Sequence, residues 1–186
     1  MEDGGCYRAV RTIDHFLRSF KSAKVDADVL EMEAALALAT HMKIDYPGCH
    51  LHQNVHIRNY SDKGQVAQQL DGVLHGHLSA PTFAMVLEAK TSIHPDHLAE
   101  ILEKVTLFRG FVSEAQKYNF SAGWEPDPPS LPLTHFSNVQ HFIPCSAGRR
   151  FPENLVQDCL MKGIVPVFPS GARFVAKGLE ILRKMV

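Results

Sequence analysis

Hydrophobic and polar positions follow two different periods along this chain. Between residues 49 and 93, three strand-like runs are separated by turn residues. On either side, apolar residues recur every three to four positions, as they do in amphipathic helices. This pattern predicts helices over 10–20, 27–43, 94–118 and 152–163, and strands over 49–60, 65–75, 82–93, 136–146 and 164–168.

The third strand of the central group, 82–93, is apolar on both faces for most of its length. Successive side chains of a strand point to opposite faces. One face therefore carries Phe83, Met85, Leu87 and Ala89, and the other carries Ala84, Val86, Glu88 and Lys90. A strand that is apolar on both sides is typical of the middle of a sheet covered by helices. Charged groups in such a strand are costly unless they are paired or bind a metal, so Glu88 and Lys90 are candidate functional residues.

The order of these elements predicts an α/β fold with one mixed central β-sheet flanked by helices, in the order α-βββ-α-β. We expect a single domain over 1–186. Its core covers 27–170, with a helical extension at 1–26 and a C-terminal tail at 171–186. The Pro-rich segment 121–132 is predicted to be a loop within the domain, because it is too short to link two domains.

Composition supports a globular protein and excludes several function classes. The 186 residues are 45% hydrophobic and 21% charged, with a formal net charge of −1, so there is no strongly basic domain of the kind common in nucleic-acid binders. The four cysteines are scattered and form no C-x-x-C pair, which argues against a disulfide framework or a zinc finger. We find no apolar run long enough for a signal peptide or a membrane span, and we expect an intracellular protein, cytoplasmic or nuclear.

A hairpin between the second and third strands would bring two carboxylates together. If residues 78–81 form its loop, Asp71 lies opposite Glu88 and Gln69 lies opposite Lys90, with opposed Cβ atoms about 4.5–5.5 Å apart. Two carboxylates at that distance repel unless a cation bridges them or one carries a proton. Oxygen ligands of this kind suit Mg²⁺ or Mn²⁺, and Lys90 beside them is suited to orient a water or stabilise charge on phosphorus.

These residues also resemble a known sequence pattern. "LDG", followed 17 positions later by "EAK", is similar to the motif of the PD-(D/E)xK phosphodiesterase superfamily, which has the restriction-endonuclease-like fold. Element order agrees over roughly residues 27–170. The resemblance implies metal-dependent hydrolysis of nucleic acid, DNA or RNA, with Asp71 and Glu88 as metal ligands, a backbone carbonyl of Ala89 as a further ligand and Lys90 as the catalytic lysine. The chain departs from the motif at Leu70, where the name of the superfamily has proline.

The same resemblance implies a glutamate from the first core helix as an additional ligand. Glu31 and Glu33 both lie in the helix predicted over 27–43. Glu33 is nearer the side of that helix that carries Val29, Leu36 and Thr40, so it is the preferred candidate.

Alternative interpretations remain open at this stage. Glu88 and Lys90 can form a purely structural ion pair while Asp71 caps a turn before Gly72. The chain can also be a non-catalytic nucleic-acid-binding or assembly protein that keeps the nuclease fold, and its near-neutral charge favours that alternative. A homodimer is a further option, since enzymes that cut both strands of a duplex are commonly dimeric, although the sequence shows no interface.

Histidine pairs offer a separate metal hypothesis. His50 and His52, and likewise His75 and His77, are two residues apart and can share a strand face, as zinc ligands do. No cysteine or further histidine has a spacing that completes the set. We therefore expect these histidines to be strand-edge or loop residues.

Overall fold

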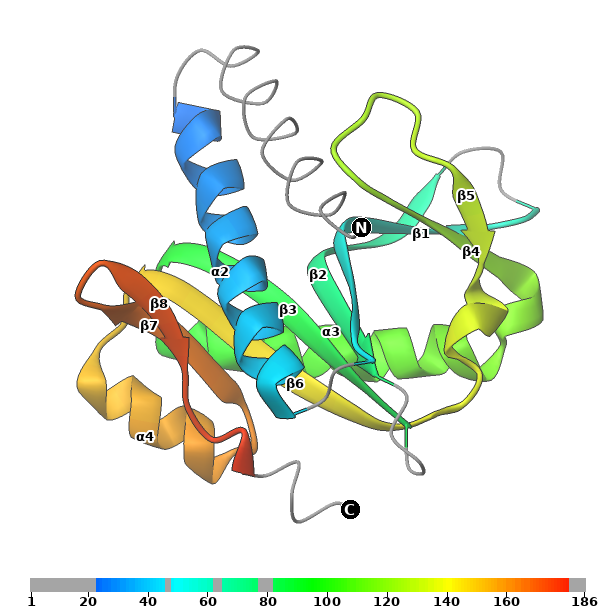
Figure 1. Cartoon of the computed structure of the whole chain (residues 1–186). Helices are drawn as coiled ribbons and strands as arrows, with labels where there is room; N and C mark the ends of the chain where they lie inside the picture. Colours follow the sequence, from blue (N-terminus) through cyan, green and yellow to red (C-terminus); the bar gives the residue numbers. More distant parts are fainter. Residues whose placement is uncertain (1–22, 46–47, 62–64, 77–81, 181–186) are drawn as a thin grey trace, which may run out of the picture.

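The fold is an α/β arrangement in which one mixed eight-stranded sheet is flanked by helices (Figure 1). The computed structural model describes residues 23–45, 48–61, 65–76 and 82–180. The helix predicted over 10–20 and the hairpin loop 78–81 lie outside these residues. The elements are α2 (Ala23–Asp45), β1 (His50–Asn59), β2 (Val66–Gly76), β3 (Thr82–Ser92), α3 (Pro95–Ser113), η1 (Ala115–Lys117), β4 (Tyr118–Ala122), β5 (Ser130–Pro132), η2 (Leu133–Phe136), β6 (Val139–Arg150), α4 (Glu153–Met161), β7 (Val165–Ser170) and β8 (Arg173–Ala176).

The strands lie in the order β5-β4-β1-β2-β3-β6-β7-β8. β6 pairs in parallel with β3 and with β7, and the other neighbouring pairs are antiparallel. β3 is therefore a central strand, as its two apolar faces predict. No helix within the described ranges is long and apolar enough to cross a membrane.

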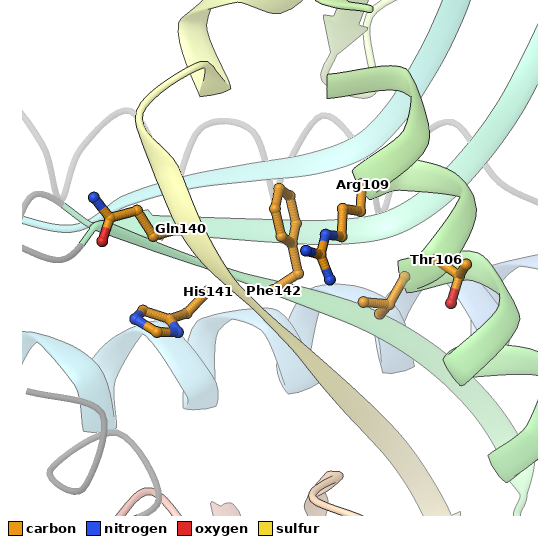
Figure 2. Close-up of a pocket in the computed structure, with 6 residues that line it drawn as sticks. Thr106, Arg109, Gln140, His141 and Phe142 are labelled. Carbon is orange, nitrogen blue, oxygen red and sulfur yellow. The ribbon is translucent and has the colours of Figure 1, made fainter. Parts of the chain in front are cut away.

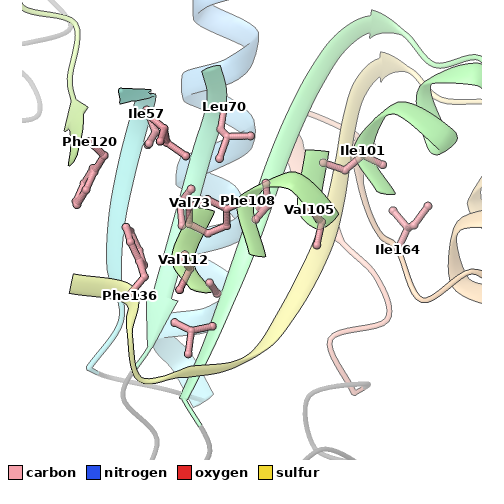
Figure 3. Packing of buried hydrophobic residues seen from close by; sticks show 14 of the residues in the cluster. Ile57, Leu70, Val73, Ile101, Val105, Phe108, Val112, Phe120, Phe136 and Ile164 are labelled. Atoms are coloured by element: carbon pink, nitrogen blue, oxygen red, sulfur yellow. The ribbon is translucent and has the colours of Figure 1, made fainter. Parts of the chain in front are cut away.

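Two buried clusters cover the two faces of the sheet. α2 packs on one face against Phe83, Met85 and Leu87 of β3. α3 and α4 pack on the other face, where the cluster includes Ala84 and Val86 of the same strand (Figure 3). The division of β3 into two faces thus agrees with the sequence prediction, and Figure 1 shows α2 and α3 on opposite sides of the sheet.

Three strands were not predicted. β4 and β5 fall at the edge of the sheet, partly inside the segment expected to be a Pro-rich loop, and the helix predicted over 94–118 ends at Ser113. β8 lies beyond residue 170, in the segment expected to be a tail, so the sheet extends past the predicted core. These strands are only three to five residues long, and their pairing partners are distant or Pro-containing, so the local pattern gives little signal for them.

The pairing of β2 with β3 positions the candidate site. Gly72 lies opposite Leu87 and Val73 opposite Val86, in the register that the hairpin prediction requires. The paired region ends at Gly72. Asp71 and Glu88 therefore come directly after the last pair, where the two strands cease to follow the regular ladder.

The alternation of side chains in β2 is interrupted at the same place. Leu70 and Val73 both belong to the cluster under α3, although residues three apart should face opposite sides of a regular strand. In the neighbouring β1, Asn54 adopts a positive φ of 48°, and its side-chain amide donates to the carbonyl of Gly123 over 2.8 Å. β1 and β2 are thus both irregular at neighbouring positions, and in β2 the irregular position is at Asp71.

Candidate functional site

Asp71 is buried at the point where β2 and β3 separate, with only 8% of its surface exposed. Its Oδ2 accepts a hydrogen bond from the backbone N–H of Ala89 over 2.6 Å. The pKa of Asp71 is raised to about 7, first by burial and then by the nearby charge of Glu88, although the Ala89 hydrogen bond and two lysines act to lower it. The carboxylate is therefore held in place at a position that penalises its charge.

Glu88 lies on the α3 side of β3 and is 4% exposed. Its Oε1 is 2.8 Å from Nζ of Lys90, and its Oε2 is 2.6 Å from Nζ of Lys104 in α3. Glu100 of α3 completes a closed ring, since its Oε1 is 3.3 Å from Lys90 and 3.6 Å from Lys104. Each lysine thus contacts both glutamates, and each glutamate contacts both lysines.

The charges of this ring reinforce one another. Burial lowers the pKa of Lys90, but the hydrogen bonds and charges of Glu88 and Glu100 outweigh it, so that the pKa is raised overall. Burial also acts to raise the pKa of Glu100, and Lys90 and Lys104 more than offset this, which leaves that pKa lowered. Lys90 is consequently cationic and Glu100 anionic at neutral pH.

The helix on the opposite face of the sheet contributes Glu31. The pKa of Glu31 is raised to about 8, first by burial and then by the charges of Asp71, Asp28 and Glu88, while Lys90 acts to lower it. These interactions place the Glu31 carboxyl at the acidic cluster. Asp28, one turn earlier in α2, is itself 7% exposed.

The structure does not place Glu33 with the other candidate residues. The Glu33 side chain is 51% exposed and forms an ion pair with Arg149, whose Nη2 lies 3.8 Å from Oε2. Residues two apart in a helix point in very different directions, so only one of these two glutamates can face the cluster. The structure brings together Asp71, Glu88, Lys90 and Glu31, and it leaves Glu33 outside.

Lys104 and Glu100 were missed by the sequence prediction. Their four-residue spacing places them on one side of α3, next to the buried Ile101 and Val105. The sequence does show that Glu100 and Lys104 are four residues apart in the helix that follows "EAK". This spacing gives no indication that α3 packs with this side over Glu88.

The donor chemistry of the cluster fits a hard divalent cation. Asp71, Glu88 and Glu31 supply carboxylate oxygens, and the pKa values of Asp71 and Glu31 are raised by burial first and by neighbouring carboxylates second. A divalent ion would favour the ionised forms. The side chains are not assembled around one point, however: among the described residues, no group of three or more His, Cys, Asp or Glu is arranged to hold a metal ion.

The histidines form a packed group on a different part of the sheet. His52 and His75 both lie against His135, with ring centroids 5.4 and 5.2 Å apart, and all three rings contact Phe136. Burial lowers the pKa of His52 to about 4. His77 falls outside the described residues. The described histidines make no metal-binding group, so the structure lends no support to zinc.

The described residues line cavities next to the sheet. One of about 900 Å³ lies between α2 and the β7–β8 hairpin and is lined by residues that include Glu33, His41, Arg149 and Arg173. A smaller one of about 270 Å³ lies between α3 and β6, and Figure 2 shows the guanidinium of Arg109 there, pointing toward Phe142. Neither cavity is lined by Asp71 or Glu88.

Comparison of the chain with protein-family models, with curated proteins and with solved structures finds no match.

Proposed function

We propose that this chain is a metal-dependent phosphodiesterase of the restriction-endonuclease-like kind, acting on nucleic acid. The observation that carries the proposal is the convergence of Asp71, Glu88 and Lys90 where β2 and β3 separate. The α-βββ-α-β order of α2, β1–β3, α3 and β6 supports the same proposal.

Each residue of the cluster has a role in this proposal. Asp71 and Glu88 would hold Mg²⁺ or Mn²⁺, and Glu31 takes the place that was expected for Glu33. The motif resemblance adds the carbonyl of Ala89. When bound there, such an ion would polarise a phosphodiester and activate a water.

Lys90 supplies the positive charge of the reaction. Its ammonium is held 2.8 Å from Glu88 and 3.3 Å from Glu100, and it keeps its proton at neutral pH. A cation fixed in a partly buried position stabilises the negative charge that develops on phosphorus, because it needs no reorganisation during the reaction. Glu100 helps to hold this ammonium in place, and Asp71 and Glu88 provide the carboxylates that would bind the metal.

A cleavage assay tests the proposal. Labelled single- and double-stranded DNA and RNA are incubated with Mg²⁺, Mn²⁺ or EDTA and with wild type, Lys90→Met or Lys117→Met. Lys117 forms an exposed ion pair with Glu114 and is the matched control. We expect metal-dependent cleavage of at least one substrate, reduced about 100-fold or more in Lys90→Met and unchanged in Lys117→Met. Cleavage that survives EDTA or Lys90→Met in a protein with a normal circular dichroism spectrum would reject the proposed chemistry.

One observation favours a second candidate, a non-catalytic nucleic-acid-binding or assembly protein with the same fold. Both oxygens of Glu88 are already engaged by lysines, so the cluster is saturated without a metal. Fluorescence anisotropy with the same four substrates separates the two candidates. The second candidate would be supported if a substrate binds in a salt-sensitive manner but is not cleaved in the presence of Mg²⁺ or Mn²⁺.

A further inference from the structure

Lys104 contacts Glu88 and Glu100 directly, although the motif assigns no role to this position. Its Nζ is 2.6 Å from Oε2 of Glu88, whereas Lys90 lies 2.8 Å from the other oxygen. The Lys104 ammonium is therefore in direct contact with one of the two oxygens of Glu88, a candidate metal ligand.

The position of Lys104 is fixed by the packing around it. Its backbone carbonyl accepts a hydrogen bond from Nε2 of Gln68 over 2.8 Å, which ties α3 to β2. The neighbouring Val105 and the preceding Ile101 are buried in the core cluster under α3. The Lys104 side chain is only 23% exposed. A lysine held in this way is part of the cluster and differs from a surface lysine that meets Glu88 by chance.

We propose that Lys104 is a built-in cation that neutralises Glu88 in the metal-free protein, so that a divalent ion must displace it from Oε2 of Glu88. The identity of the ion rests on the proposed function. The competition itself follows from the geometry, because an ammonium 2.6 Å from Oε2 and a divalent ion bound to the same oxygen would repel each other strongly in a partly buried site.

Glu100 provides a place for the displaced ammonium. It lies one helical turn before Lys104, and its Oε1 is already 3.6 Å from Nζ. A small rotation of the Lys104 side chain toward Glu100 would release Oε2 of Glu88 while the lysine keeps an ion pair. Lys90 retains its own contact with Glu88 through Oε1.

This arrangement explains how two acidic residues are tolerated in the metal-free fold. Without a cation, buried Glu88 beside Asp71 would strongly disfavour folding. Lys104 and Lys90 together supply that compensation, and the consequence is a weaker affinity for metal ions than the carboxylates would otherwise have.

The test is calorimetric titration of Mn²⁺ into EDTA-treated and dialysed protein, together with thermal unfolding with and without Mn²⁺. The variants are Lys104→Met, Lys104→Gln, which keeps a hydrogen-bond donor if the methionine variant fails to fold, and the control Lys117→Met. We expect Lys104→Met to bind Mn²⁺ roughly tenfold more tightly than wild type, the scale on which residues next to metal ligands act. Its metal-free melting temperature should be lower and its Mn²⁺-induced increase larger, because the ion then supplies the missing charge.

The possible results separate this inference from the proposed function. Equal or weaker Mn²⁺ affinity in Lys104→Met and Lys104→Gln, with clear binding to wild type, would show that Lys104 does not compete and would leave the proposed function standing. Binding to the variants but not to wild type at millimolar Mn²⁺ would support the competition and overturn metal-dependent catalysis by the native chain. No binding to any form would overturn both.

Discussion

Asp71 and Ala89 are joined by a hydrogen bond from the backbone N–H of Ala89 to Oδ2 of Asp71, over 2.6 Å. In a regular antiparallel ladder, a carbonyl of β2 would accept from β3. Here the ladder ends at Gly72, and a side-chain carboxylate takes the place of the backbone acceptor. The Asp71 carboxylate thus links β2 to β3 and is also part of the acidic cluster. It therefore has a structural role in addition to the proposed catalytic one.

The two roles of Asp71 can be separated by substitution. Asp71→Asn keeps an oxygen that accepts from Ala89 and removes the charge, whereas Asp71→Ala leaves the buried N–H without this acceptor. At pH 8 in EDTA, we expect Asp71→Ala to lower the free energy of unfolding by about 1–3 kcal/mol and Asp71→Asn to leave it unchanged or raise it. Urea denaturation measures both. Asp127→Asn, in an exposed loop, is the control. Equal destabilisation by both Asp71 variants would contradict the assigned hydrogen bond.

The raised pKa values of Asp71 and Glu31 predict a pH dependence of stability. In the folded protein these groups keep their protons up to about pH 7 and about pH 8, whereas in the unfolded chain they lose them near pH 4. Unfolding therefore releases protons between about pH 4 and pH 8, and the contribution of both groups to stability falls as pH rises through this window.

His52 acts in the opposite direction, because burial lowers its pKa to about 4. Its contribution to stability rises with pH between about 4 and 6.5. The informative measurement is therefore the difference in unfolding free energy between wild type and the double variant Asp71→Asn, Glu31→Gln at each pH in EDTA. We expect wild type to lose stability relative to this variant as pH rises from 4 to 8. A difference that does not change with pH would show that neither carboxyl is perturbed.

Much of the sheet could be predicted from the sequence because its central strands carry strong local patterns. The two-faced apolar pattern of β3 and the turn residues before it specify a hairpin, and the observed pairing of Val73 with Val86 has the expected register. The edge strands β4, β5 and β8 have no such pattern. Their existence depends on partners such as β1 and β7, which become neighbours only after the chain has folded.

The helix contributions to the cluster could not be predicted, for a related reason. Glu33 was preferred for its proximity to Leu36 and Thr40, but both of these residues are exposed, and they line the cavity next to β7–β8. α2 is apolar around much of its circumference, so its sequence does not show which side faces the sheet. Lys104 was missed for the same reason: packing decides which side of α3 faces β3, and the sequence does not show it.

Glu31 and Glu33 form a matched pair for testing which glutamate of α2 joins the proposed site. Glu31→Gln removes a half-buried negative charge that interacts with Asp71 and Glu88, so it should weaken Mn²⁺ binding by about tenfold or more. Glu33→Gln changes an exposed residue next to Arg149 and should leave the affinity within about twofold of wild type, since exposed ion pairs contribute little. Calorimetric titration at pH 8 compares the two. A larger loss in Glu33→Gln would restore the original assignment.

Gly148 of β6 is expected to maintain the position of Lys90. It pairs with Lys90 across the sheet, and a Cβ there would lie 2.5 Å from Cγ1 of Ile93 and 3.2 Å from the carbonyl of Lys90. Ile93 is 2% exposed and belongs to the core cluster under α3. Gly148→Ala should therefore lower the free energy of unfolding by about 1–3 kcal/mol, as overpacking commonly does.

Gly110 of α3 provides the control for this substitution, because a Cβ at that position meets no atom within 4 Å. Gly110→Ala should raise the free energy of unfolding by about 0.5–1 kcal/mol through the better helix propensity of alanine. Both substitutions restrict the unfolded chain in the same way, so the difference between them isolates the clash with Ile93 and the Lys90 backbone. Urea denaturation measures this difference, and nearly equal effects would mean that β6 can move away from β3 at Lys90 without cost. In that case the sheet would not hold Lys90 rigidly beside Glu88, and the electrostatic role proposed for Lys90 would lose its structural basis.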